Sequence, residues 1–291
     1  MLKVAIPNKG ALSEDTVRII LDAGYHCRRR SRELVVSDAD HEVKFIFLRP
    51  RDIAVYIRNG ILDMGITGRD LMLDSGANLS ELLPLGFGHS RFCYAAQAES
   101  DFDYAPSDDA LSPERLYSQR IATSYPRLLK QDLDRRGVRA DVIPLDGAVE
   151  ISIWLGVADL IADVVQSGRT LREAGLVVIG DPILHSEAVL VARTSDVVEE
   201  EAAYLFVERI RGIVVAREYV MIEYDIPESM LTDACNITPG IESPTVSPLS
   251  KKGWVAVKSM SRRKDANLIM DRLVKIGAKG IIVTDIRTCR L

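Results

Sequence analysis

Short apolar runs alternate with amphipathic stretches over the first two-thirds of the chain, and this alternation predicts βαβ units. A first set has expected strands at 3–7, 43–48 and 62–67, with expected helices at 13–23 and 51–58. Ser13 is expected to cap the first helix. A second set covers residues 120–179, with expected strands at 120–123, 140–144, 158–165 and 176–179, a helix to about residue 136, and a helical stretch from Gly147. Two such sets indicate two α/β lobes with a cleft between them.

The pattern changes after residue 195. A helix is predicted from about residue 196 to 216, then strands at 218–226, 253–258 and 280–284, with a helix at 264–276 before the last strand. This order predicts a small α+β sandwich of about the size of a ferredoxin-like domain. The segment 238–248 is rich in proline, serine and threonine, so it cannot be a central strand and is expected to be a shaped loop.

The overall composition is that of an ordinary globular protein. The chain has 291 residues, of which 47% are hydrophobic and 27% charged, and a formal net charge of -5. The acidic balance argues against a dedicated nucleic-acid binder, because a surface that neutralises phosphates usually makes a domain basic. We find no apolar stretch long enough to span a membrane and no secretory signal at the start, so a cytoplasmic location is expected.

The cysteines and histidines give little sign of a metal or disulfide site. The four cysteines are scattered, with no CxxC pair, so buried or idle thiols are the favoured interpretation. The four histidines show no metal-binding spacing and are each expected to be incidental; they are His26, His41, His89 and His185.

A polar turn follows the apolar run that ends at Val165. Ser167, Gly168, Arg169 and Thr170 precede what reads as a short helix. Taken alone, such a turn is more often a simple helix cap than a binding site. The alternative is a cradle for a phosphate, in which the glycine allows close approach of the anion, the hydroxyls donate hydrogen bonds and the arginine adds charge.

Acidic residues surround this turn in the sequence. Asp146, Gly147 and Glu150 open the preceding element, at the strand end where open α/β sheets bind ligands. Asp159 and Asp163 lie four positions apart, and each is flanked by apolar residues. They are either edge carboxylates or groups that bind ribose hydroxyls, directly or through a hydrated Mg²⁺ shared with a diphosphate.

Three polar turns of the first lobe follow three predicted strands. They carry Lys9 in 7–11, Arg49 in 48–52, and Gly68 and Asp70 in 65–70. Any one of them would be a routine capped turn, but together they favour a cleft that takes an anionic, phosphorylated ligand. The basic cluster at 27–32 is more typical of a solvated face. There is no GxGxxG or Walker A pattern and no nucleophile elbow, so any nucleotide binds without those loops.

These segments together resemble the long form of the ATP phosphoribosyltransferase family, over the whole chain and in the right order. The segments that carry the resemblance are IPNKGALSED, FLRPRDIAVYI, DMGITGRDL, RIATSYP, LDGAVEISIWLGVADLIADVVQSGRTL, SEAVLV, DACNITPGIESPTVSPL, NLIMDRL and IGAKGIIVTDIR. The resemblance implies two lobes like those of periplasmic binding proteins and a C-terminal ferredoxin-like (ACT-like) α+β regulatory domain. The implied limits are 1–90 and 184–205 for catalytic lobe I, 91–183 for catalytic lobe II, which binds phosphoribosyl diphosphate, and 206–291 for the regulatory domain.

The family's reaction would join adenine N1 of ATP to C1 of phosphoribosyl diphosphate and release diphosphate, with Mg²⁺ as the cofactor. By resemblance, Ser167, Gly168, Arg169 and Thr170 would hold the 5′-phosphate of the sugar, with Asp159 and Asp163 near the ribose or the Mg²⁺-diphosphate. Asp146, Gly147 and Glu150 would border the same pocket. Lys9, Arg49, Gly68 and Asp70 would line the ATP and diphosphate side, where Arg49, together with Arg32 from a neighbouring subunit, would neutralise the leaving diphosphate.

The C-terminal domain resembles the family's histidine-sensing module. The resemblance implies that Asp225, Ile241 and Thr245 line a histidine pocket, that histidine and AMP inhibit the enzyme, and that the chain forms a homo-hexamer with an active dimer unit. A different interpretation of the same lobes is a non-catalytic sensor of a phosphorylated metabolite, to which an appended small domain would be equally suited.

Overall fold

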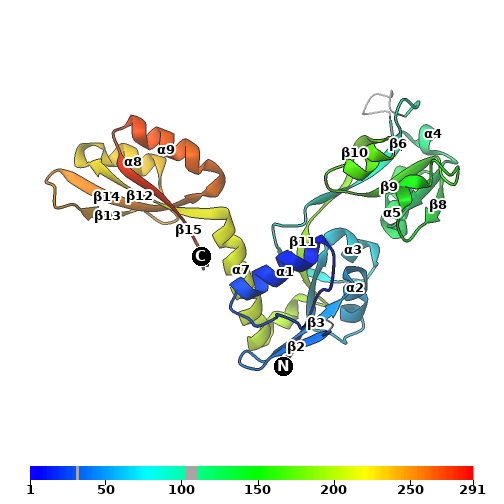
Figure 1. The fold of residues 1–291 in the computed structure, drawn as a ribbon, viewed down its shortest axis with the longest axis horizontal. Coiled ribbons are helices and arrows are strands. Elements are labelled where there is room, and N and C mark those ends of the chain that lie inside the picture. Colours follow the sequence, from blue (N-terminus) through cyan, green and yellow to red (C-terminus); the bar gives the residue numbers. More distant parts are fainter. Residues whose placement is uncertain (31–32, 103–109, 291) are drawn as a thin grey trace. The chain divides into compact units, whose positions relative to one another are not determined.

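The computed structural model describes residues 1–30, 33–102 and 110–290 and divides into two compact units (Figure 1). Unit 1 comprises Met1–Arg18 and His26–Tyr204, and unit 2 comprises Ile19–Tyr25 and Leu205–Leu291. None of the helices in the described part of the chain combines the length and apolar character needed to cross a membrane.

Lobe I of unit 1 is built on a six-stranded mixed sheet in the order β2-β3-β1-β4-β11-β5. The strands are β1 (Leu2–Pro7), β2 (Val35–Asp38), β3 (Val43–Leu48), β4 (Met64–Gly68), β5 (Ser80–Pro84) and β11 (Ala188–Ala192). The central strands β1 and β4 are buried at every position except Lys3, because both faces of the sheet are covered. The helices are α1 (Ala11–Asp22), α2 (Pro50–Arg58) and α3 (Arg69–Asp74), and α2 packs Ile53 and Ile57 onto the sheet.

Lobe II is built on a five-stranded sheet in the order β10-β6-β9-β7-β8. Its strands are β6 (Ser90–Gln97), β7 (Arg120–Thr123), β8 (Asp141–Pro144), β9 (Leu160–Val165) and β10 (Leu176–Ser186). Its helices are α4 (Pro113–Leu116), α5 (Pro126–Arg136) and α6 (Arg169–Glu173), with a single 3₁₀ turn, η1 (Val149–Ile151). β7 runs parallel to both β8 and β9, so the polar turns after β7 and β9 meet at one edge of the sheet.

The chain passes between the two lobes twice. It leaves lobe I after β5 to form β6, and it returns after β10 to form β11, which is inserted antiparallel between β4 and β5. Two mixed sheets linked by two crossing segments confirm the expected pair of α/β lobes of the periplasmic-binding-protein type.

Unit 2 ends in a ferredoxin-like domain. After η2 (Ser195–Glu199) and α7 (Glu201–Glu218), the order is β12 (Tyr219–Pro227), η3 (Glu228–Met230), α8 (Leu231–Ile237), β13 (Thr245–Pro248), β14 (Trp254–Arg262), η4 (Arg263–Asp265), α9 (Ala266–Lys275) and β15 (Lys279–Asp285). The four strands form an antiparallel sheet in the order β13-β14-β12-β15, which confirms the expected ferredoxin-like α+β domain and adds α8 and β13 to the predicted elements. Val220, Ile222 and Tyr224 of β12 belong to the buried core of this domain, whereas the alternate positions of the strand are partly exposed.

Three local expectations are wrong. Ser13 does not cap the first helix: α1 begins at Ala11, and the Ser13 hydroxyl, inside the first turn, donates to the Pro7 carbonyl at 2.8 Å. The helical stretch expected from Gly147 is only the η1 turn, because Gly147 and Ala148 have positive φ, which breaks a right-handed helix. The segment 238–248 is not wholly a loop, since Thr245–Pro248 forms β13, at the edge of the sheet, where a proline is tolerated.

Candidate active site

A cavity of about 540 Å³ opens at the carboxyl end of β9. Lobe II supplies nearly all of its lining, from the turns after β7 and β9 and from the segment around η1, and α2 of lobe I supplies Arg51. The lining side chains that can bind a polar ligand come from these elements and include Arg51, Ser124, Tyr125, Asp146, Glu150, Asp163, Gln166, Ser167, Arg169 and Thr170. This is the edge at which parallel α/β sheets place their ligands.

The turn that follows β9 has the backbone of a tight cradle. Gly168 has φ +69°, the left-handed conformation that favours glycine, and it begins the short helix α6. The Ser167 hydroxyl accepts from the Arg169 amide at 3.4 Å, and the Arg172 guanidinium donates to the Ser167 carbonyl at 3.2 Å. The turn therefore presents backbone amides and hydroxyls to the cavity on a backbone that a larger residue at position 168 would strain.

Asp163, at the end of β9, is the acid whose environment is most altered in this cavity. Burial raises the pKa of its carboxyl to about 6, and the negative charge of Glu150 acts in the same direction. The Val164 amide, at 2.7 Å, and the Ser124 hydroxyl, at 3.5 Å, oppose this by donating to the carboxylate. A carboxylate held here would favour a ligand that offers hydroxyl donors or a cation.

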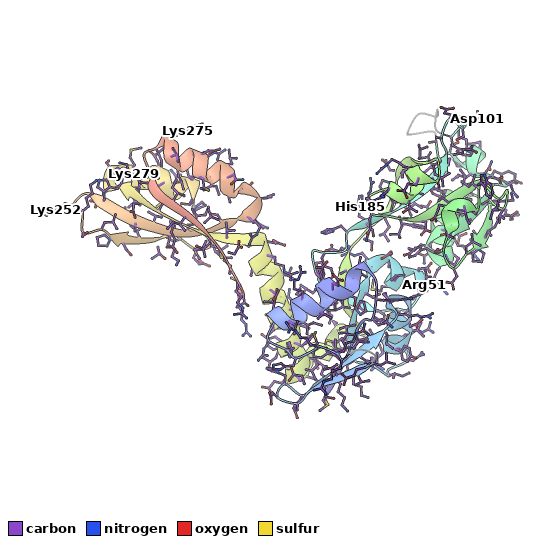
Figure 2. The ribbon with its side chains drawn as sticks, viewed as in Figure 1. Arg51, Asp101, His185, Lys252, Lys275 and Lys279 are labelled. Carbon is purple, nitrogen blue, oxygen red and sulfur yellow. The ribbon has the colours of Figure 1, made fainter. Side chains whose placement is uncertain are left out.

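Arg51 connects lobe I to the cavity (Figure 2). Its guanidinium donates to Asp74 at 3.0 Å and to the Ser124 carbonyl at 2.7 Å, and it lies 5.1 Å from the centre of the Tyr125 ring. Asp74 also accepts from the Arg127 and Leu128 amides of α5, at 2.9 and 3.2 Å, so it satisfies the start of that helix from the other lobe. Arg51 is thereby held in place beside the cavity by groups of both lobes.

Tyr125 of lobe II also contacts lobe I, through a hydrogen bond with Asp70. Burial raises the pKa of its phenol above the ordinary range, and the charge of Asp70 and a hydrogen bond with that residue add to the shift. Asp70 is itself buried, and its carboxylate accepts from the Ser186 hydroxyl at 2.7 Å. Its carboxylate also lies so close to Gly68 that a Cβ there would collide with it, which explains the glycine.

Comparison with known proteins identifies the family. The family model described as HisG, ATP phosphoribosyltransferase, matches residues 49–212, and the model of the HisG C-terminal domain matches residues 216–288. An ATP phosphoribosyltransferase of Salinibacter ruber is 60% identical over 291 residues, covering all of both chains. The chain belongs to the ATP phosphoribosyltransferase family.

More distant members agree with this assignment. An ATP phosphoribosyltransferase of Nocardia farcinica is 55% identical over 290 residues, with 100% of this chain and 99% of the relative covered. Among solved structures, the ATP phosphoribosyl transferase (HisG:HisZ) complex from Thermotoga maritima matches with a TM-score of 0.62 and 27% identity, over 74% of this chain and 99% of that chain. The match to a C-terminal domain of this family fits the long form that the sequence indicated.

The structure brings together seven of the residues that sequence reasoning placed at the phosphoribosyltransferase site. All seven line the 540 Å³ cavity, namely Asp146, Glu150, Asp163, Ser167, Gly168, Arg169 and Thr170. Gly147 lies beside Asp146 but outside the lining. The Arg169 side chain is 80% exposed and is paired with Glu173 at 2.7 Å.

Asp159 lies at the other end of β9 from the cavity. Its carboxylate accepts from the Arg120 amide at 2.9 Å and from the Arg120 guanidinium at 2.6 and 3.1 Å. The hydrogen bond from that guanidinium is the largest cause of a lowered pKa for Asp159. These contacts are those of an ion pair that joins the start of β7 to the start of β9, away from the ligand-binding edge.

The first-lobe residues are spread over separate turns. Lys9 is exposed after β1, and Arg49 is exposed as the residue before α2, outside the cavity lining. Gly68 and Asp70 are buried at the junction of β4 and α3, from which Asp70 reaches Tyr125. Arg32 lies outside the described residues.

Sequence reasoning missed Arg51, Ser124 and Tyr125 as lining residues. Arg51 stands two positions after Arg49 in the same turn, and the segment RIATSYP that contains the other two was noted only for its resemblance. The available signal was that Ser124 and Tyr125 directly follow a predicted parallel strand, at the same sheet edge as the turn after β9.

In the C-terminal domain, Asp225 and Thr245 share the face of the sheet that α8 and α9 leave open. Asp225 alternates with the buried Tyr224 and Ile226 of β12, and Thr245 lies opposite Lys258 of β14, which in turn pairs with Glu223. Ile241 is 46% exposed in the loop before β13. The helices therefore do not occupy the face on which Asp225 and Thr245 lie (Figure 1).

Proposed function

We propose that this chain joins adenine N1 of ATP to C1 of 5-phosphoribosyl 1-diphosphate, releasing diphosphate, as the first step of histidine biosynthesis in the cytoplasm. The observation that carries the proposal is the cavity at the end of β9, where a glycine-containing turn and three carboxylates face a single space. Membership of the ATP phosphoribosyltransferase family supports the same reaction.

The 5′-phosphate of the sugar substrate needs hydrogen-bond donors and its ribose hydroxyls need acceptors, and the cavity offers both. The Ser167–Thr170 turn supplies amide and hydroxyl donors for the 5′-phosphate, with Gly168 providing the left-handed backbone of the turn. Asp163 supplies an acceptor for ribose hydroxyls, and Asp146 and Glu150 border the same space. In this orientation C1 of the ribose would lie away from the turn.

The acids of the cavity have the donor chemistry of a site for a hard divalent cation, although their oxygens do not gather within 4.8 Å of one another. Asp146, Glu150 and Asp163 are oxygen ligands of the kind that Mg²⁺ takes, and three carboxylates would repel a diphosphate unless positive charge lay between them. Bound Mg²⁺ would supply charge that offsets the developing negative charge of the diphosphate. Arg51 would add a fixed cation that stabilises the leaving diphosphate. The resemblance to the family makes Arg49 and Arg32 candidates for the same role.

The reaction needs no covalent intermediate on the protein. ATP brings its own nucleophilic nitrogen, and the leaving diphosphate departs as an anion, so the protein must align the two substrates and stabilise the departing charge. Lys9, Gly68 and Asp70 lie on lobe I, which we assign to ATP. Arg51 of lobe I contacts Asp74 and the Ser124 carbonyl, and Tyr125 of lobe II contacts Asp70. These contacts link lobe I to the edge of the lobe II cavity.

The C-terminal domain would make the enzyme sensitive to its pathway's product. Asp225 offers a carboxylate to the ammonium or imidazole of histidine, and Thr245 and Ile241 offer a hydroxyl and an apolar contact. We assign histidine as an inhibitor at this place, AMP as an inhibitor that competes for the ATP side, and a homo-hexamer with an active dimer unit as the assembly. Asp225→Ala should relieve inhibition by histidine and spare catalysis; full inhibition of that variant would contradict the assignment.

The activity is tested by mixing tag-free protein with ATP, phosphoribosyl diphosphate and Mg²⁺ and following the absorbance of phosphoribosyl-ATP. We expect product only when all three are present. Well-folded protein that binds phosphoribosyl diphosphate without forming product would instead favour a sensor.

A further inference from the structure

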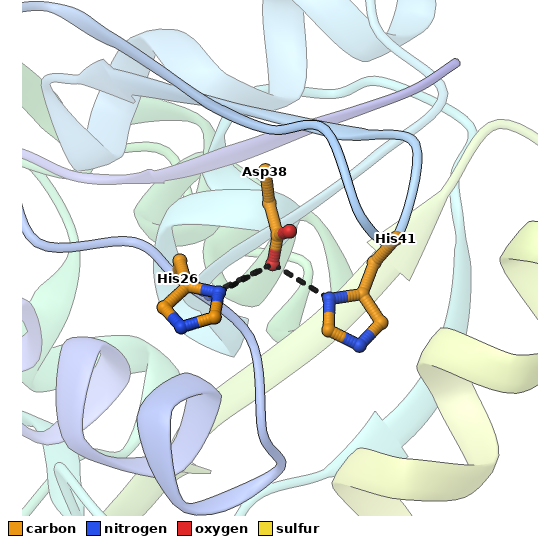
Figure 3. Close-up of side chains that lie close together, drawn as sticks. All are labelled: His26, Asp38 and His41. Atoms are coloured by element: carbon orange, nitrogen blue, oxygen red, sulfur yellow. Dashed lines mark hydrogen bonds and ion pairs between the residues drawn. The ribbon is translucent and has the colours of Figure 1, made fainter.

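Two histidines and one aspartate gather at the start of lobe I, outside the cavity described above (Figure 3). His26 follows α1, Asp38 is the last residue of β2, and His41 lies in the turn between β2 and β3. One ligand atom from each residue lies within 4.8 Å of the other two. Residues 26 and 41 are too far apart in the chain for a short metal-binding motif, and it is the β2–β3 hairpin that brings them together.

The carboxylate of Asp38 is at the centre of the group. Its Oδ2 lies 2.9 Å from Nδ1 of His41 and 3.6 Å from Nδ1 of His26, and it also accepts the His26 amide at 2.8 Å. Two ligands of a tetrahedral zinc ion stand about 3.3 Å apart, as follows from metal–ligand distances near 2.0 Å. The two spacings to Asp38 bracket that value, and the ligand atoms of His26 and His41 lie within 4.8 Å of each other, so the two rings must draw closer to share one ion.

The burial of the three side chains suits a surface-accessible metal. Asp38 has only 1% of its side chain exposed, whereas His41 has 25% and His26 has 76%. The buried carboxylate is held by the His26 amide and by the His41 ring, and the exposed His26 ring leaves a path for the ion and for a completing water.

We propose that His26, Asp38 and His41 form a binding site for a divalent transition-metal ion of the zinc class, with solvent as the fourth ligand. Two imidazoles and a carboxylate are a donor set suited to Zn²⁺, Co²⁺ or Ni²⁺ rather than to Mg²⁺. The ion neutralises a buried carboxylate and takes the place of the His41–Asp38 hydrogen bond. This site is separate from the three acids of the catalytic cavity, which offer oxygen ligands alone.

A metal at this position joins the two ends of the segment 26–38. That segment carries Arg28, Arg29 and Arg30, all exposed. Arg29 donates to the Asn8 carbonyl at 2.8 Å and lies 4.8 Å from the centre of the Phe47 ring. Bound metal would tie His26 to the β2–β3 hairpin, so it should restrain the neighbouring Arg28, Arg29 and Arg30.

The test is isothermal titration of ZnCl₂ into tag-free protein in a non-chelating buffer, comparing wild type with His26→Asn, His41→Asn and the matched control His185→Asn. His26 and His185 are both exposed, so neither substitution should disturb the core. We expect one equivalent of zinc in wild type and in His185→Asn, and affinity at least about tenfold lower in His26→Asn and His41→Asn. No zinc binding by wild type, or equal binding by His26→Asn and wild type, would overturn the proposal.

Two further readouts guard against binding elsewhere. Co²⁺ added in place of zinc should give the visible absorption of a tetrahedral nitrogen and oxygen site; an intense near-ultraviolet cobalt–thiolate band would assign the ion to cysteines and overturn the proposal. Zinc should also slow cleavage by trypsin after Arg28, Arg29 and Arg30 in wild type but not in His26→Asn. Equal cleavage of wild type with and without zinc would show that the ion does not join the ends of this segment.

Discussion

The two ends of β9 carry the same type of residue in contrasting surroundings. Asp163, at the carboxyl end, lines the cavity, and burial together with Glu150 raises its pKa to about 6. Asp159, just before the strand, is paired with the Arg120 guanidinium at 2.6 Å and has a lowered pKa. Each end also has a glycine with left-handed backbone, Gly168 with φ +69° and Gly156 with φ +68°.

The difference shows what separates a binding carboxylate from a structural one. The amino end of the strand already has a cation for its acid, so nothing there calls for a ligand. The carboxyl end collects acids, hydroxyls and amides around an open space, an arrangement suited to a polar ligand. The predictions below use the amino end as the control for the carboxyl end.

The largest effect is expected from Gly168→Asp. The new side chain would strain a left-handed residue and place negative charge where we position the 5′-phosphate, so affinity for phosphoribosyl diphosphate should fall by about 100-fold or more. Gly156→Asp introduces the same charge and a similar strain at the other end, where a Cβ meets nothing within 4 Å, and should leave affinity unchanged. Steady-state kinetics with varied phosphoribosyl diphosphate measures the apparent affinity of both variants. An equal loss of affinity in the two would contradict a phosphate site at the carboxyl end of β9.

Asp163→Asn should lower kcat/KM by about 10- to 100-fold, since a hydrogen bond to a charged group is worth about 1.5–3 kcal/mol. Asp159→Asn should keep kcat/KM near that of wild type. The same assay at saturating ATP compares them directly. If Asp159→Asn lowered kcat/KM more than Asp163→Asn does, the result would indicate that the ribose binds near the start of β9.

Arg51→Met should reduce kcat by about tenfold, because it removes a fixed cation and the contacts that hold Ser124 and Asp74. Arg49→Met, two positions earlier and outside the cavity lining, is the matched control and should have a smaller effect. Single-turnover measurements separate loss of chemistry from loss of binding. A greater loss in Arg49→Met would return the leaving-group role to that residue.

The smallest effect concerns stability against pH. Because the pKa of Asp163 is raised to about 6 in the folded chain, the native state holds this proton more tightly than the unfolded chain does, and the free energy of unfolding should fall as pH rises from about 4 to about 6. Asp163→Asn should remove this dependence and stabilise unit 1 at pH 7. Asp159, with its lowered pKa, contributes stability at neutral pH that is lost in acid, so Asp159→Asn should slightly destabilise. Urea denaturation at pH 5 and pH 7 measures both changes.

Much of this architecture was accessible from sequence, for reasons that particular residues make plain. The turn 167–170 could be predicted because an apolar run ends abruptly in small polar residues, and the ferredoxin-like order followed from the alternation in 218–226. Which of Arg49 and Arg51 lines the cavity could not be predicted from sequence. Residues two apart at a helix start point in different directions, and only the packing of the lobes decides which one faces the cavity. The pairing of Asp159 with Arg120 joins positions 39 residues apart, and the cluster of His26 with His41 depends on the register of β2 and β3.

The most direct measurement is a crystal structure of the protein with phosphoribosyl diphosphate and Mg²⁺. We predict the 5′-phosphate within hydrogen-bonding distance of the Ser167–Thr170 amides and hydroxyls, the ribose hydroxyls on Asp163, and the Asp159–Arg120 pair unchanged. A 5′-phosphate bound elsewhere, with the turn after β9 empty, would contradict the account.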